Sequence, residues 1–231
     1  EFFQAGIEDL GDPDIATTDA RSLTEAVAMV RLAAPEAELE ILLGDQTVFE
    51  AVLKALGLPR GWRMRLARTF GNAALLKETL TELSSERPMP NLEAHLSKLA
   101  AKGEAAKLAK AIADEMAAKS LPVHAGRSPE EIAERLIEKI ELASVKLTKR
   151  QFAALSEFLS IREPLATASD HLAKFAAKVD VAIDLALADF ATRAQEIARL
   201  DVDTNTVIYD AAFGRPLDYY TGLVFEIRSP Q

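Results

Sequence analysis

Alternating apolar and polar residues predict strands in the first part of the chain. Within residues 2–9, the apolar side chains of Phe3, Ala5 and Ile7 alternate with polar or small ones. Successive side chains of a strand point to opposite faces, so this segment is predicted to have one apolar and one polar face. Residues 38–43 form a second predicted strand.

The end of the chain has the same character. Residues 206–209 and 217–228 are rich in β-branched and aromatic side chains, which favour strands. The turn-prone residues 210–214 lie between them. This arrangement predicts an antiparallel hairpin.

Helical periodicity dominates the rest of the chain. Apolar residues recur at spacings of three and four, which predicts helices at residues 18–33, 46–56, 92–101, 105–116, 132–145 and 152–159. The alanine-rich segment 164–200 carries an apolar stripe suited to a helix pair or a partner interface, made of Leu172, Phe175, Val179, Ala182, Ile183, Ala186, Leu187 and Phe190.

Local signals place some of the helix ends. Thr17 or Thr18 is the expected N-cap of the first helix, and Gly44-Asp45 is expected to be a turn before the second. Ser128 precedes Pro129 and stands three residues before Glu131, the spacing of a capping box. The helix after Ser128 is therefore predicted to begin there.

Strands at the two ends and helices between them predict an α+β fold, in which one sheet is assembled from distant segments. Residues 1–60 and 201–231 are expected to form a discontinuous core, with residues 61–200 as a mainly helical insertion. Because the chain begins and stops beside predicted strands, we expect flanking sequence at both ends.

The amino-acid composition indicates the cellular environment of the protein. The chain has 231 residues, 49% of them hydrophobic, and no cysteine. A disulfide framework and a thiolate metal site are therefore ruled out, and a reducing, cytoplasmic environment is expected. No apolar run approaches the roughly 20 residues that span a bilayer, so no membrane association is expected.

Charge argues against nucleic acid as a partner. The formal net charge is −9, whereas nonspecific nucleic-acid binding relies on many lysines and arginines. The densest basic stretch, residues 60–68, contains Trp62 and Leu66 four positions apart. It is predicted to be a short amphipathic helix that turns those two side chains inward.

Candidate chemistry is sparse. His95, His124 and His171 lack the spacing of metal ligands, and no nucleophile elbow, phosphate-binding glycine loop or cofactor fingerprint is present. No metal, cofactor or catalytic residue is therefore predicted.

Polar residues on two predicted strands remain. One group is Gln4 with Glu8, and the other is Arg215, Asp218 and one of the neighbouring Tyr219 and Tyr220. Each residue alone is compatible with an ordinary exposed strand position. Their joint placement favours a binding site.

These residues also carry a family resemblance. The run Arg215-Pro216-Leu217-Asp218-Tyr219-Tyr220, followed by Val224-Phe225-Glu226, resembles the histidine-specific motif of histidyl-tRNA synthetases. Phe3-Gln4-Ala5-Gly6-Ile7-Glu8 is similar to the strand of their second class II motif. The resemblance covers roughly the first sixty and last thirty residues, and it implies a class II aminoacyl-tRNA synthetase-like antiparallel sheet with a large helical insertion.

Within this group, the two motifs look closest to a family that does not charge tRNA, the regulatory subunits of short-form ATP phosphoribosyltransferase. The resemblance implies a non-catalytic protein that activates the catalytic subunit and mediates histidine feedback in the first step of histidine biosynthesis. It further implies three interactions: with that catalytic subunit, with histidine and with further copies of the chain.

Roles for single residues follow from the resemblance alone. Gln4 and Glu8 would bind the amino or imidazole group of histidine, Tyr220 would contact the ligand, and Arg215 would hold its carboxylate. Asp218 and Tyr219 would support them. Pro216 departs from the family's usual glycine, which removes a backbone donor. Together with the helical middle of the chain, this departure favours a sensor or assembly role over tRNA charging.

Two other functions stay open at this point. The chain can be a fragment of an active histidyl-tRNA synthetase, which requires the ATP-binding arginine of motif 2 and a third motif beyond this sequence. It can also be a helical scaffold that retains the fold and binds a partner without binding histidine.

Overall fold

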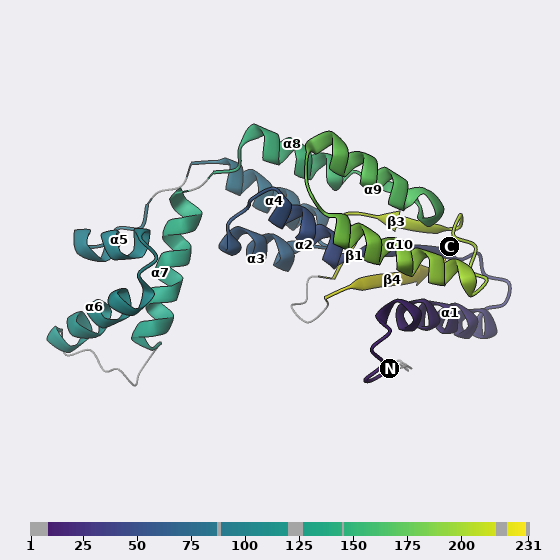
Figure 1. Ribbon diagram of the computed structural model, residues 1–231. Coiled ribbons are helices and arrows are strands. Elements are labelled where there is room, and N and C mark those ends of the chain that lie inside the picture. Colours follow the sequence, from purple (N-terminus) through teal and green to yellow (C-terminus); the bar gives the residue numbers. More distant parts are fainter. Residues whose placement is uncertain (1–8, 87–88, 120–126, 145, 216–220, 230–231) are drawn as a thin grey trace.

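A computed structural model of the chain describes residues 9–86, 89–119, 127–144, 146–215 and 221–229. Figure 1 shows a small sheet packed with helices, and further helices set apart at the left. Among the described residues, no helix has the length and apolarity needed to cross a membrane. The predicted strand at residues 2–9 lies outside the described residues except for Asp9.

Within the described residues, the sheet has four strands in the order β2-β3-β1-β4. These are β1 (Glu40–Asp45), β2 (Arg162–Pro164), β3 (Val207–Asp210) and β4 (Leu223–Arg228). β1 pairs antiparallel with β4 and parallel with β3, and β2 pairs antiparallel with β3. The sheet is therefore mixed, and the predicted all-antiparallel sheet is wrong for the β1–β3 pair.

The predicted hairpin of residues 206–209 with 217–228 is also wrong. β3 and β4 both pair with β1, which lies between them. β1 has five consecutive buried residues from Ile41 to Asp45, a pattern typical of a central strand with neighbours on both sides. Alternation within β3 and β4 marks them as strands but does not specify this partner.

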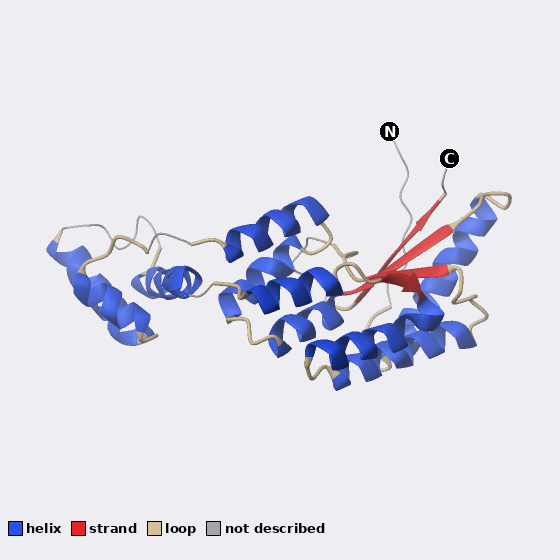
Figure 2. Cartoon of the chain, turned by 90° about the horizontal axis from the view of Figure 1, so that it is seen from above, coloured by secondary structure: helices blue, strands red, loops and turns tan. Residues whose placement is uncertain are grey.

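Seven helices of the described part of the chain contribute to the main core. These are α1 (Ile15–Ala33), α2 (Gln46–Ala55), α3 (Arg60–Thr69), α4 (Ala73–Ser84), α8 (Lys149–Phe158), α9 (Leu165–Val179) and α10 (Asp184–Arg199). Helices gather on one face of the sheet, and no described helix lies across the other (Figure 2). Inside the core, the Phe49 ring stacks on Phe70 at 4.3 Å between centroids.

Helices α5 (Ala94–Ala101), α6 (Ala105–Ala118) and α7 (Pro129–Ser144) form a separate unit. Its own hydrophobic core includes Leu96, Leu108, Ile112 and Ile140. The helical part of the chain thus divides between two cores. The domain boundaries expected at residues 60 and 200 stay a prediction.

Most predicted helices are present, with some corrected ends. Asp14 caps α1 by accepting from the Thr17 N–H, so neither Thr17 nor Thr18 is the N-cap. The capping box at Ser128 and Glu131 is confirmed by reciprocal bonds of 3.1 and 3.2 Å. Trp62 and Leu66 on α3 are buried as predicted.

The alanine-rich segment 164–200 is a helix pair. α9 ends at Val179, its C-cap Asp180 has a left-handed φ of 58°, and α10 begins at Asp184. From the stripe, Leu172, Phe175, Ile183 and Phe190 are buried in the main core. These four members of the stripe thus face the main core rather than a partner.

Candidate functional site

The sheet face without a covering helix carries a group of charged side chains. The register of the strands places them together, because Glu40 lies opposite Arg228 and Arg162 lies opposite Asp210. The polar sheet face is defined here as Glu40, Arg162, Asp210, Glu226 and Arg228.

Ion pairs link these residues across strands. The Arg162 guanidinium donates to Asp210 at 2.8 Å and to Glu40 at 3.1 Å. On β4, Arg228 donates to Glu226 at 2.9 Å. The face therefore alternates positive and negative groups, an arrangement that suits a ligand with both an ammonium and a carboxylate.

Arg215 joins this face from the loop after β3. Its Nη2 lies 3.5 Å from the Glu226 Oε2, and its guanidinium lies 5.8 Å from the Phe213 ring centroid. The Arg215 side chain is 45% exposed. A permanent cation held by one partner and open to solvent can still bind an incoming carboxylate.

Close backbone contacts fix the position of Arg215. A Cβ on Gly44 would lie 1.9 Å from the Phe213 carbonyl oxygen, and one on Gly71 would lie 2.1 Å from the Gly214 oxygen. Gly71 also has a φ of +87°, which favours glycine. Glycine at both positions therefore lets residues 213–214 lie directly against β1 and the loop before α4.

The Glu226 carboxylate is held in its charged form. The hydrogen bond from Arg228, together with the nearby charges of Arg228 and Arg215, lowers the pKa of Glu226. Favourable contacts to the ionised carboxylate explain the direction. Glu226 is therefore negative at neutral pH and available to an ammonium.

Gln4, Glu8, Asp218, Tyr219 and Tyr220 lie outside the described residues. Arg215 is the predicted histidine-binding residue for which the structure gives a position, and it lies beside Glu226.

Sequence reasoning missed Arg162, Glu40 and Asp210. Arg162 belongs to β2, whose three residues are too few to produce a visible alternation. Glu40 and Asp210 begin and end strands, and nothing in the sequence indicates that they meet. These three positions became visible only through strand pairing.

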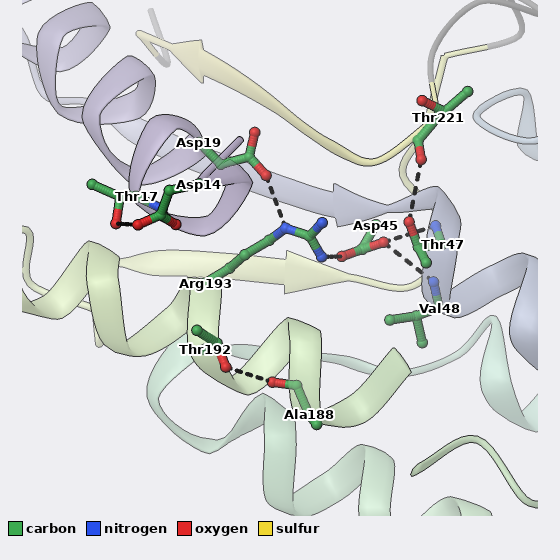
Figure 3. Close-up of polar contacts among 10 residues, drawn as sticks. All are labelled: Asp14, Thr17, Asp19, Asp45, Thr47, Val48, Ala188, Thr192, Arg193 and Thr221. Atoms are coloured by element: carbon green, nitrogen blue, oxygen red, sulfur yellow. Dashed lines mark hydrogen bonds and ion pairs between the residues drawn. The ribbon is translucent and has the colours of Figure 1, made fainter. Parts of the chain in front are cut away.

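A second charged cluster lies among the helices and β1 (Figure 3). Arg193 of α10 donates from Nε to Asp19 of α1 at 2.8 Å and from Nη1 to Asp45 at 3.3 Å. The side chain of Asp45 is fully buried, and that of Arg193 is 12% exposed. This trio, Arg193, Asp19 and Asp45, ties α10, α1 and β1 together.

Asp45 also begins α2. Its Oδ1 accepts from the N–H groups of Thr47 at 2.8 Å and Val48 at 3.2 Å. The expected turn at Gly44-Asp45 is wrong, because both residues belong to β1 and Asp45 is the N-cap. Burial raises the pKa of Asp45 while the Arg193 charge opposes that rise.

Tyr209 lies near this trio on β3. Its ring packs edge-on against Phe190 at 4.9 Å, and its hydroxyl is buried without a hydrogen-bond partner in the described part of the chain. Burial and the charges of Asp45 and Asp210 raise the pKa of Tyr209 well above its usual value. The phenol is therefore neutral at physiological pH.

One histidine lies among carboxylates. His95, Glu93 and Glu115 place ligand atoms within 4.8 Å of one another. Lys119 lies 3.4 Å from Glu115 and 3.8 Å from Glu93. One ammonium therefore lies within ion-pair distance of both carboxylates, and the cluster is an ion-pair group.

Comparison with known proteins identifies the relatives of the chain. No family model matches it. It is 51% identical over 227 residues to an ATP phosphoribosyltransferase regulatory subunit of Mesorhizobium japonicum, covering 98% of this chain. It is 48% identical over 230 residues to a protein of the same name from Brucella anthropi, covering the whole chain.

The chain spans 61% of the length of each of these relatives. It is homologous to them along almost all of its own length, which confirms the resemblance inferred from the motifs.

The fold has a relative among solved structures. The histidyl-tRNA synthetase of Nostoc sp. PCC 7120 matches 95% of this chain with a TM-score of 0.50 and 14% identity, over 37% of its own length. At this identity the match concerns the fold alone. It supports a class II synthetase-like architecture built around a mixed sheet.

Proposed function

We propose that the chain is part of a regulatory, non-catalytic subunit of short-form ATP phosphoribosyltransferase. This subunit would activate the catalytic subunit and mediate feedback by histidine in the first step of histidine biosynthesis. The observation that carries the proposal is 51% identity along 98% of the chain to a protein named as such a subunit. The proposed location is the cytoplasm.

The polar sheet face and Arg215 are proposed as part of the histidine site. Arg215 would bind the carboxylate, and Glu226 would exchange an arginine partner for the ammonium of the ligand. Two features support this role: the 3.5 Å contact between these side chains and the lowered pKa of Glu226. Charge-assisted hydrogen bonds of both signs suit a zwitterion.

Further contacts to histidine are proposed from the motif resemblance. Gln4 and Glu8 would receive the amino or imidazole N–H groups, and Tyr220 would contact the ligand, supported by Asp218 and Tyr219. Carboxylate and amide oxygens accept hydrogen bonds from such groups. The proposed roles of these residues rest on the motif resemblance and not on the contacts described for Arg215.

Co-purification and enzyme assay test the regulatory function. The full-length protein is mixed with the short catalytic subunit, and transferase turnover is measured with and without histidine. We expect a stable complex, faster turnover and inhibition by histidine. No complex and unchanged turnover would refute the proposal.

A second candidate function is that of a histidyl-tRNA synthetase. The resemblance of the segment from Arg215 to Glu226 to the histidine-specific motif of these enzymes favours it. Histidine-dependent pyrophosphate exchange by the full-length protein would support this alternative. Absence of exchange together with activation of the transferase would exclude it in favour of the regulatory function.

A further inference from the structure

A groove of about 880 Å³ lies between α3 and α7, away from the sheet. α7 is the member of the separate helical unit nearest to the helices around the sheet (Figure 1). The two helices are in close contact beside the groove, since a Cβ on Gly61 would lie 3.1 Å from Glu138 Cγ. The groove thus spans the junction of the two hydrophobic cores.

Its lining is cationic although the chain is acidic. Two carboxylates, Glu134 and Glu138, face five cations: Arg65, Arg68, Arg127, Arg135 and Lys139. The formal net charge of the whole chain is −9. The local excess of positive charge creates an electrostatic potential that attracts anionic groups, although the chain as a whole is acidic.

Three of these cations are not neutralised locally. Arg65 is ion-paired with Glu82. No carboxylate within the described residues forms an ion pair with Arg127, Arg135 or Lys139, and all three are exposed. Arg135 and Lys139 stand four residues apart on α7, so they lie on the same side of the helix.

Part of the lining of the groove is apolar. Ile132, Leu136 and Leu142 line it and are half-buried. Ile132 and Leu136 are also four residues apart, so an apolar stripe runs beside the cationic one along α7. None of the ten described lining residues is aromatic, so the groove offers no platform on which nucleic-acid bases stack.

We propose that this groove binds an acidic amphipathic helix of a protein partner. Apolar side chains of that helix would cover Ile132 and Leu136, and its carboxylates would pair with Arg135, Lys139 and Arg127. Helix-in-groove recognition combines an apolar contact with flanking charge pairs of this kind. The inference goes beyond the proposed function and does not require the partner to be the catalytic subunit.

A binding assay with defined probes tests the groove in the full-length protein. The first probe is a fluorescein-labelled helical peptide of about 20 residues with leucine and glutamate at helical spacing. The second is a single-stranded DNA oligonucleotide of about 20 nucleotides. Histidine and the catalytic subunit are absent, so the result is independent of the proposed regulatory function.

Arg135→Glu/Lys139→Glu is the diagnostic variant. Its matched control, Lys77→Glu/Lys110→Glu, changes the charge equally at exposed positions of α4 and α6. We expect the diagnostic variant to weaken peptide binding about tenfold or more and the control to change it less than about threefold. Thermal melting of both variants verifies that the fold is retained.

Three outcomes would overturn the inference. They are no peptide binding by the unmodified protein, equal losses in the two variants, and tighter binding of the DNA than of the peptide. Weaker peptide binding at higher salt is expected, because exposed charge pairs are screened.

Discussion

The polar sheet face with Arg215 and the buried trio contain the same kinds of groups in opposite surroundings. The Arg215 and Glu226 side chains are 45% and 31% exposed, whereas those of Arg193 and Asp45 are 12% and 0% exposed. Water can replace either partner of the first pair but neither partner of the second. Exposed pairs can therefore exchange partners with a ligand, while the buried pair serves to hold elements together.

The largest effect is expected from breaking the buried trio. Arg193→Met leaves the Asp45 carboxylate buried without its cation, so we expect a loss of about 3–5 kcal/mol in the free energy of unfolding. Urea denaturation measures it. Arg199→Met, which removes an exposed arginine from the same helix, is the control and should cost less than about 1 kcal/mol. Equal losses of stability in Arg193→Met and Arg199→Met would contradict the contrast between buried and exposed ion pairs.

The next effect concerns how Arg215 is positioned. Gly44→Ala puts a methyl group where the Phe213 carbonyl lies, and we expect a loss of about 1–3 kcal/mol in stability together with weaker histidine binding. Gly222→Ala is the matched control, because no described atom lies within 4 Å of its added Cβ. Calorimetric titration with histidine and urea denaturation supply the two readouts. Unchanged histidine affinity in a folded Gly44→Ala protein would show that the position of Arg215 does not matter for histidine binding.

A smaller effect is a pH dependence of the Arg193→Met penalty, which is the loss in the free energy of unfolding that this substitution causes. Arg193 opposes the burial that raises the pKa of Asp45, so its removal raises that pKa further. The folded variant then keeps a proton that the unfolded carboxyl loses near its ordinary pKa of about 4. Asp45 of the unmodified protein, whose pKa is also raised, releases its proton at a lower pH than Asp45 of the variant. The penalty should therefore grow once the pH passes the folded-state pKa of Asp45 in the unmodified protein, and it should be larger at pH 8 than at pH 5.

Urea denaturation of both proteins across this range measures that dependence. Asp45→Asn in the Arg193→Met background should flatten it, because the titrating carboxyl is gone. A penalty that shrinks as the pH rises would show that another group is responsible.

The smallest effect on stability is expected at the exposed pair. Arg215→Gln should change the free energy of unfolding by less than about 1 kcal/mol, yet weaken histidine binding about tenfold by removing a charge-assisted hydrogen bond. Calorimetric titration and urea denaturation separate the two effects. Arg150→Gln on α8 removes another exposed arginine and should alter neither. Full histidine affinity in Arg215→Gln would remove this residue from the proposed site.

Local patterns predicted most of the helices, because apolar periodicity and caps act within a few residues. The capping box of Ser128 and Glu131 is one example. Strand pairing depends on distant segments, so alternation in β3 and β4 could not reveal that β1 lies between them. β2 was missed because a three-residue strand has no period of its own.

The charged clusters were predictable to different degrees. Arg215 was found through a motif, whereas Arg162 depends on a strand that had not been predicted. Arg193 carries a sequence signal, since it stands three residues after Phe190 and four before Ile197, both buried. A charge on the apolar side of a helix indicates a buried partner, but not which carboxylate supplies it.

The pairing of β1 with β3 has a consequence for the order in which the chain folds. Ile41 pairs with Val207, so β1 cannot gain its parallel neighbour on the ribosome until nearly the whole of this sequence has been synthesised. The contacts within α5–α7 are far closer in the chain and can form earlier. The separate helical unit would then be structured while β1 is still unpaired, and chaperones would encounter an exposed apolar strand during that interval.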